Sequence, residues 1–137
     1  MELIYTNYFT KDDLRKRGYN LEADDVLDAS HFDNLQDAID DFMDNTLRKI
    51  YNMMIPYIGR NMTDSFFSDM ANTDLTGVAL DYKNRLNRAL IEQAIFDYDN
   101  GDAQTTSSYD SQKDRASYSS KAIAELWDII QDLANRR

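Results

Sequence analysis

Apolar residues recur at three- and four-residue spacing along much of the chain, which is the period of one face of an α-helix. The clearest stretch runs through Leu35, Ile39, Phe42, Met43, Leu47, Ile50, Met54 and Tyr57. It predicts a first long helix that starts at Asp33 or Asn34, with Pro56 and Gly59 as its end signals.

A second long helix is predicted from an N-cap at Thr73 or Asp74 to about Tyr98. The apolar stripe of its first half comprises Leu75, Ala79, Tyr82, Leu86 and Ala89. Beyond Leu90 the apolar residues surround much of the helix, and a helix that is apolar nearly all round usually lies at the centre of its domain.

Shorter helices are predicted from cap signals. Thr10 is a good N-cap for a helix over Lys11 to Arg17 that Gly18 stops, and Asp64 is a candidate cap for a short helix containing Phe66 and Phe67. Residues 1–9 are aromatic and β-prone, so they form either an extended arm or, as we favour, a segment that packs locally.

The last third of the chain combines a polar segment with an amphipathic one. Residues 101–117 are mostly Ser, Thr, Gln, Asp and Lys, with Tyr109 as the single aromatic, so we expect a loop that is mobile in the free protein. Ser117, Ser119 or Ser120 then caps a C-terminal helix over 119–137. Its predicted buried face is Ile123, Leu126, Trp127, Ile130 and Leu133, and Arg136 and Arg137 stand at its end.

These patterns predict an all-α fold: a small helical bundle in a single domain over residues 1–137, a length that supports one hydrophobic core. The absence of cysteine excludes disulfides and thiolate metal sites. Met1 to Phe9 lacks the features of a signal peptide, and no apolar run approaches the roughly 18 to 20 residues that span a bilayer, so we expect a soluble protein.

The formal charge of −10 makes free DNA or RNA an unfavourable ligand, because nucleic-acid affinity depends on basic side chains. Acidic residues gather near the start of the first long helix: Asp33, Asp37, Asp40, Asp41 and Asp44. Asp is favourable near a helix N-terminus, and Asp44 and Arg48 have the spacing of an ion pair. A solvated or subunit-facing acidic face is therefore preferred to a metal site or a catalytic carboxylate pair.

Other candidate chemistry is weak. The segment from Asp97 to Asp102 begins like a calcium loop, but Gly101 falls one position too early and Ser108 stands where a glutamate is required. His31 is the only histidine and is interpreted as a structural or surface residue. No cofactor, metal or catalytic residue is therefore predicted.

Nine tyrosines and one tryptophan are many for a small helical domain. Most should belong to the core, but aromatic residues are also enriched in interfaces. Tyr109 and Tyr118 lie in or beside the polar loop, so we predict them as partner contacts together with Trp127, Arg136 and Arg137 of the last helix.

Taken in order, these elements resemble the head-to-tail connector proteins (adaptor or head-completion proteins) of long-tailed double-stranded DNA bacteriophages. The phrases that carry the resemblance are the helix entry Tyr8-Phe9-Thr10-x-x-x-Leu14, the long helix through Arg48 to Ile58, the helix ending over 94–102, and Ser119-Ser120-x-Ala122-Ile123-x-x-Leu126. The resemblance covers most of the chain. It departs at Ile129 to Asp132, where the family often has a glycine-containing turn.

The resemblance implies a virion protein without catalytic activity. Such proteins form a ring, commonly of twelve copies, that docks under the portal protein and presents a platform to the next connector or the tail. It implies a location at the head–tail junction, and in the cytoplasm of the infected cell before assembly. A channel lined by Asp would let DNA pass without specific binding.

The main alternative is a small acidic regulator that binds a host DNA-binding protein by imitating the charge of DNA. The cluster Asp33 to Asp44 fits both functions, whereas the long loop before a capped last helix favours the connector. An enzyme that uses an unrecognised carboxylate pair comes third.

Overall fold

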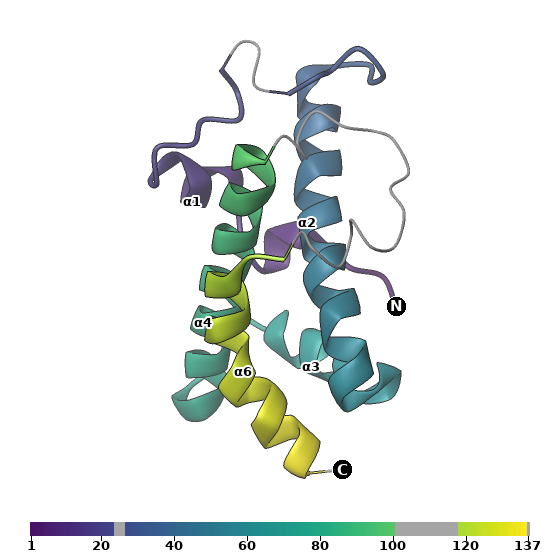
Figure 1. Ribbon diagram of the computed structural model, residues 1–137, viewed down its shortest axis with the longest axis vertical. Helices are drawn as coiled ribbons and strands as arrows, with labels where there is room; N and C mark the ends of the chain where they lie inside the picture. Colours follow the sequence, from purple (N-terminus) through teal and green to yellow (C-terminus); the bar gives the residue numbers. More distant parts are fainter. Residues whose placement is uncertain (24–26, 101–117, 137) are drawn as a thin grey trace.

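Helices build all the regular structure in the described part of the chain, so the predicted all-α class is confirmed. The structure is a computed structural model that describes residues 1–23, 27–100 and 118–136 (Figure 1). The elements are the 3-10 turn η1 (Tyr5–Asn7) and the helices α1 (Lys11–Arg15), α2 (Leu35–Ile58), α3 (Arg60–Met70), α4 (Gly77–Asp99) and α6 (Ser120–Asn135). The predicted loop over 101–117 lies outside the described residues.

The two long helices and α6 form the body of the molecule (Figure 1). α2 runs down one side, α4 runs upward beside it, and α6 descends along α4 in the opposite direction. α4 contacts α1, α2, α3 and α6, so the prediction that this helix is central is confirmed. Beyond Leu90 its buried side contains Ile91 and Ala94, as expected, but also the polar residues Gln93 and Asp97.

Local capping signals set several helix ends where they were predicted. The Thr10 hydroxyl accepts a hydrogen bond from the Asp13 N–H (3.3 Å), and the Asp13 carboxylate accepts one from the Thr10 N–H (2.9 Å), which completes a capping box. Asn34 caps α2 through the Asp37 N–H (2.9 Å). Ser119 caps α6 through the Ala122 N–H (3.2 Å).

Of the two predicted end signals of α2, Gly59 is confirmed and Pro56 is wrong, and the predicted cap at Asp64 is also wrong. Pro56 does not stop α2, which continues to Ile58: the hydrogen bond it removes is the one to the carbonyl of Asn52, an exposed residue that water can reach. Gly59, with φ of 85°, ends α2 and at once begins α3. Asp64 is therefore not a cap. It lies inside α3, where its carboxylate accepts a hydrogen bond from the Tyr51 hydroxyl (2.5 Å).

The start of α4 also differs from its prediction. The Thr73 hydroxyl donates to the Asp74 carboxylate (3.3 Å), so these two side chains bond to each other instead of capping a helix. Thr76 is the N-cap residue, without a side-chain cap bond, and the helix begins at Gly77. Leu75 thus precedes the helix but still packs against the core.

The N-terminal segment packs against the body of its own chain. Leu3, Tyr8 and Phe9 belong to the hydrophobic core, and the Tyr8 hydroxyl donates to the carbonyl of Phe67 in α3 (2.8 Å). Residues before η1 and after η1 therefore both contribute side chains to the hydrophobic core.

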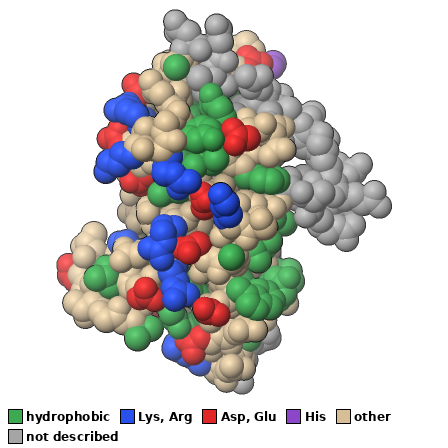
Figure 2. Space-filling view, turned by 60° about the vertical axis from the view of Figure 1, so that its left-hand side comes forward, with side chains coloured by type: hydrophobic (Ala, Val, Ile, Leu, Met, Phe, Trp, Pro, Cys, Tyr) green, Lys and Arg blue, Asp and Glu red, His purple; other side chains and the backbone are tan. Residues whose placement is uncertain are grey.

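Partly exposed ion pairs line the contact between α6 and α4. Arg88 contacts Glu125 (2.5 Å), and one turn earlier on α4 Arg85 contacts Asp128 (3.4 Å), which lies three residues later on α6. Further along the same contact, the Tyr82 hydroxyl of α4 donates a hydrogen bond to Asp132 of α6 (2.5 Å). Figure 2 shows the result: on the side of α1 and α4, Lys and Arg side chains alternate with Asp and Glu down the face.

A buried carboxylate joins the three main helices. Asp97 of α4 is only 2% exposed, and it accepts hydrogen bonds from Thr46 Oγ1 (3.0 Å) and Lys49 Nζ (2.9 Å) of α2. Gln93 Nε2 donates to the same carboxylate (2.8 Å), and its Oε1 accepts from the backbone N–H of Ser119 (2.9 Å), the N-cap of α6. The start of α6 is thereby linked to α2 through a chain of buried polar groups.

Removing this carboxylate should destabilise the protein strongly. We predict that Asp97→Ala lowers the free energy of unfolding by about 2–4 kcal/mol, because the buried donors of Thr46 and Gln93 lose their acceptor. Asp97→Asn keeps an acceptor and should cost about 1 kcal/mol. The control Asp44→Ala removes only the exposed ion pair with Arg48 and should cost about 0.5 kcal/mol or less. Urea unfolding followed by circular dichroism measures all three.

The pH dependence tests the ionisation of Asp97. Burial raises the pKa of Asp97, against the opposing effect of Lys49, Gln93 and Thr46. The native state then holds this proton more tightly than the unfolded chain, so the stability that Asp97 contributes is greatest in acid and is lost as the pH rises through its native pKa. The difference in unfolding free energy between the wild type and Asp97→Asn should fall from about pH 3.5 to pH 7. A difference that grows with pH would mean that Lys49 outweighs burial.

Candidate docking surface

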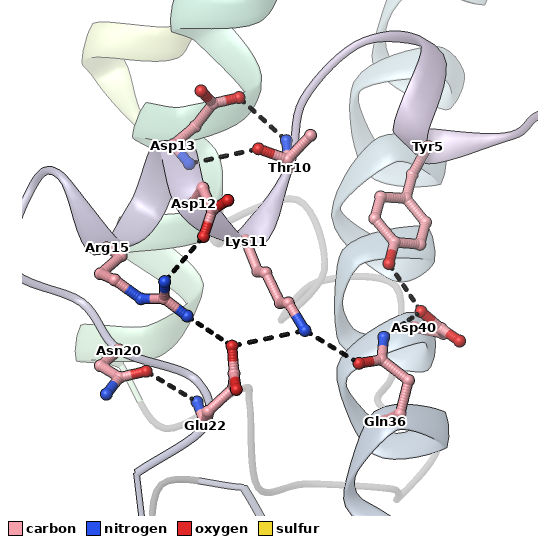
Figure 3. A network of polar contacts seen from close by, with 10 residues as sticks. All are labelled: Tyr5, Thr10, Lys11, Asp12, Asp13, Arg15, Asn20, Glu22, Gln36 and Asp40. Atoms are coloured by element: carbon pink, nitrogen blue, oxygen red, sulfur yellow. Dashed lines mark hydrogen bonds and ion pairs between the residues drawn. The ribbon is translucent and has the colours of Figure 1, made fainter.

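The predicted acidic cluster on α2 does not form one site. Figure 3 shows Asp40 turned toward the N-terminal segment, where its carboxylate accepts hydrogen bonds from the Tyr5 hydroxyl (2.6 Å) and from Gln36 Nε2 (2.9 Å). Asp44 pairs with Arg48 (2.8 Å), as predicted. Asp33, Asp37 and Asp41 remain on the exposed surface. Asp37 and Asp41 are one turn apart on α2 and Asp33 lies just before the helix, and we call these three exposed carboxylates the acidic row.

The remaining network of Figure 3 is structural. Lys11 Nζ lies between Gln36 Oε1 (3.1 Å) and Glu22 (3.3 Å), and Arg15 pairs with Asp12 (2.9 Å) and Glu22 (2.5 Å). These contacts connect α1 to the segment after it and to the first turn of α2. The charges of this region are satisfied within the chain.

Two exposed aromatic side chains meet between the end of α2 and α6. Tyr57 is 48% exposed and Trp127 is 40% exposed, and their ring centroids are 5.5 Å apart with ring planes at 87°. We call this pair the aromatic corner. Large aromatic side chains in solvent are typical of contact surfaces, since they bury much area with little loss of rotamer freedom.

The predicted burial of Trp127 on the inner face of α6 is therefore wrong. The inner face consists of Ala122, Leu126, Ile129, Ile130 and Leu133, with Ile129 fully buried. α6 packs against α4 and α2 at once, and Trp127 lies at the margin of that packing, against Tyr57. The prediction of Trp127 as a partner contact stays a prediction.

Tyr57 was not among the predicted contact residues. Its spacing places it on the apolar stripe of α2, and the periodicity of a helix indicates which face turns inward but not where the neighbouring helices end. The sequence carries no further signal that separates Tyr57 from the buried Met54.

The other predicted contact residues fall in different places. Tyr118 is half-buried against the core, and Arg136 is exposed at the end of α6 and paired with Asp132 (2.7 Å). Tyr109 and Arg137 lie outside the described residues.

The described residues contain no group of three or more His, Cys, Asp or Glu side chains placed to hold a metal ion. His31 is exposed. Of the calcium-like segment, Asp97 is turned into the core and Asp99 accepts a hydrogen bond from the Tyr19 hydroxyl (3.2 Å), while Gly101 and Asp102 lie outside the described residues. These two carboxylates are thus already engaged within the chain.

No protein-family model, curated protein or solved structure matches the chain. Across the residues that the structure places, no helix is both long and apolar enough to cross a membrane.

Several tyrosines are committed to internal hydrogen bonds with carboxylates. Besides the Tyr5–Asp40 contact, Tyr51 donates to Asp64 (2.5 Å) and Tyr82 donates to Asp132 (2.5 Å). Burial, followed by the bond to Asp40, raises the pKa of Tyr5. For Tyr51 and Tyr82 the carboxylate bond is the larger cause of the raised pKa.

These pairs predict a loss of stability in alkali. Because the native state holds the phenolic protons more tightly than the unfolded chain, their contribution is complete below about pH 10 and is lost as the pH rises through the native values. Tyr82→Phe removes one such group and should cost about 0.5–1.5 kcal/mol near neutral pH. The Tyr82→Phe variant should also lose less unfolding free energy than the wild type as the pH rises above about 10.

Absorbance at the phenolate band and circular dichroism, recorded together during an alkaline titration, test this expectation. The ionisation of Tyr5, Tyr51 and Tyr82 should coincide with unfolding, so part of the phenolate signal should rise together with the loss of helix. Complete tyrosine ionisation with the helices still native, or an unchanged alkaline profile in Tyr82→Phe, would contradict it.

Proposed function

We propose that this chain is a virion protein, the head-to-tail connector of a long-tailed double-stranded DNA bacteriophage. In this proposal, copies form a ring, commonly of twelve, that joins the portal protein to a tail protein or a second connector. The proposal assigns the chain no catalysis. It places the protein at the head–tail junction, and in the cytoplasm of the infected cell before assembly.

The observation that carries the proposal is the arrangement of the last helix. α6 follows two long helices, is capped at Ser119 within one of the phrases that carry the resemblance, and lies along α4 with an exposed aromatic side chain. A terminal helix that is fixed to the body and presents Trp127 outward is suited to contact a partner.

The surface charge supports passage of DNA. The row Asp33, Asp37 and Asp41 is exposed, and carboxylates repel the phosphate backbone. In a ring, such a row would face the channel and let the genome slide. Strong binding of the purified protein to duplex DNA at physiological salt would contradict this assignment.

Crosslinking mass spectrometry on a pull-down of tagged protein from the native producing cells tests the function. An amine-reactive reagent samples Lys121, which is exposed in the first turn of α6, and Lys16, exposed beside α1, serves as the internal comparison. A carboxylate-reactive reagent samples Asp33, Asp37 and Asp41. We expect Lys121 to link to a portal or tail protein more often than Lys16 does.

The alternative gives a different result. A host DNA-binding protein recovered through the acidic row, without virion proteins, would replace the connector by an acidic regulator. Because mass spectrometry identifies the linked residues, one experiment separates the two functions.

A further inference from the structure

The helix α6 adds one face to a core that the earlier elements already share. Its inner face supplies five buried core residues, and the other core residues that the structure describes lie between Leu3 and Ala94. The polar contact of Arg88 with Glu125 at its edge is partly exposed and therefore stabilises the helix little. A segment attached in this way can open locally, at a lower free energy than global unfolding requires.

The start of α6 covers a buried polar group. The fully buried Gln93 accepts a hydrogen bond from the Ser119 N–H at Oε1 (2.9 Å) and donates one from Nε2 to the Asp97 carboxylate (2.8 Å). Ser119 and the carboxylate therefore lie on either side of a single amide group. Lifting the start of α6 would bring water to this amide and to the carboxylate beside it.

The docked form depends on the donors that replace this water. The Asp97 carboxylate accepts hydrogen bonds from Thr46 Oγ1 (3.0 Å) and Lys49 Nζ (2.9 Å), which both belong to α2. Loss of such a donor is costly while the carboxylate stays buried, because burial keeps water from replacing it. In an opened form water supplies the missing donor, so the same loss costs less there. A weaker contact on α2 therefore favours the opening of α6.

We propose that α6 is a strap, a helix that releases from the body as a unit, and that the contacts of Asp97 with α2 set how often it opens. Gln93 couples the two events, since its amide bonds the Asp97 carboxylate at one end and the first residue of the strap at the other. The strap is a property of the free chain, so this proposal does not depend on the proposed function.

Hydrogen exchange of backbone amides, followed by NMR at increasing urea and corrected for intrinsic rates, measures the opening. The amides of Ile123, Leu126 and Ile129 should share one opening free energy and exchange at least tenfold faster than those of Ile50 and Leu90 in α2 and α4. Their opening should depend on urea less than global unfolding does, because it exposes less surface. A single exchange free energy for α6 and the body would overturn the proposal.

Two buried threonines provide a matched pair of variants. Thr46→Val removes a donor to Asp97, whereas Thr63→Val removes the hydrogen bond that its hydroxyl donates to the Gly59 carbonyl (2.7 Å). Both side chains are fully buried, and valine nearly keeps their shape. Thr46→Val should accelerate the exchange of the α6 amides at least threefold, and Thr63→Val should leave that exchange unchanged.

The conservative variant Thr46→Ser separates the hydroxyl from packing. It keeps the donor and loses one methyl group, so its α6 amides should exchange at close to the wild-type rate. Unchanged α6 exchange in Thr46→Val, or equal acceleration in Thr63→Val or Thr46→Ser, would overturn the control of the strap by α2. The wild-type measurement needs no variant, so it tests the strap even if Thr46→Val does not fold.

Discussion

The burial of Asp97 is the constraint on which the rest of the fold depends. A carboxylate inside a hydrophobic core is costly unless donors surround it, and here the donors come from Thr46 and Lys49 of α2 and Gln93 of α4. These contacts are satisfied only when the two long helices lie side by side in one register. Gln93 then also presents its carbonyl oxygen to the first residue of α6.

This arrangement explains how α6 presents a surface. The Ser119 N–H binds the buried Gln93 and so fixes the start of α6, and the apolar inner face packs the rest of the helix against the body. Exposed ion pairs with Arg88 and Arg85 of α4 line the edge of this contact. Only the outer side is left for contacts with other molecules. Trp127 therefore occupies a fixed position, supported by Tyr57 from a different helix, and a preorganised aromatic group loses little entropy on binding.

Features of the fold that depend on a few neighbouring residues could be predicted from the sequence. The caps at Thr10, Asn34 and Ser119 are of this kind, as is the period of the long helices. The features that could not be predicted depend on tertiary contacts. Asp64 accepts a hydrogen bond from Tyr51 instead of capping a helix, and Trp127 is exposed because it lies at the edge of the contact between α6 and the other helices. Asp97 lies in an Asp-rich stretch that looks exposed, and only the donors on α2 bring it into the core. The aromatic corner could not be predicted because its two rings are far apart in sequence.

Hydroxyl-radical footprinting of purified virions from the producing cells, read by mass spectrometry, tests the connector function most directly. The chain should be present in many copies per particle, and oxidation of Tyr57 and Trp127 should be much lower in the particle than in the free protein. Their exposure in the free protein makes such protection measurable. Absence of the chain from the particles, or equal oxidation in both states, would contradict the proposed docking through α6.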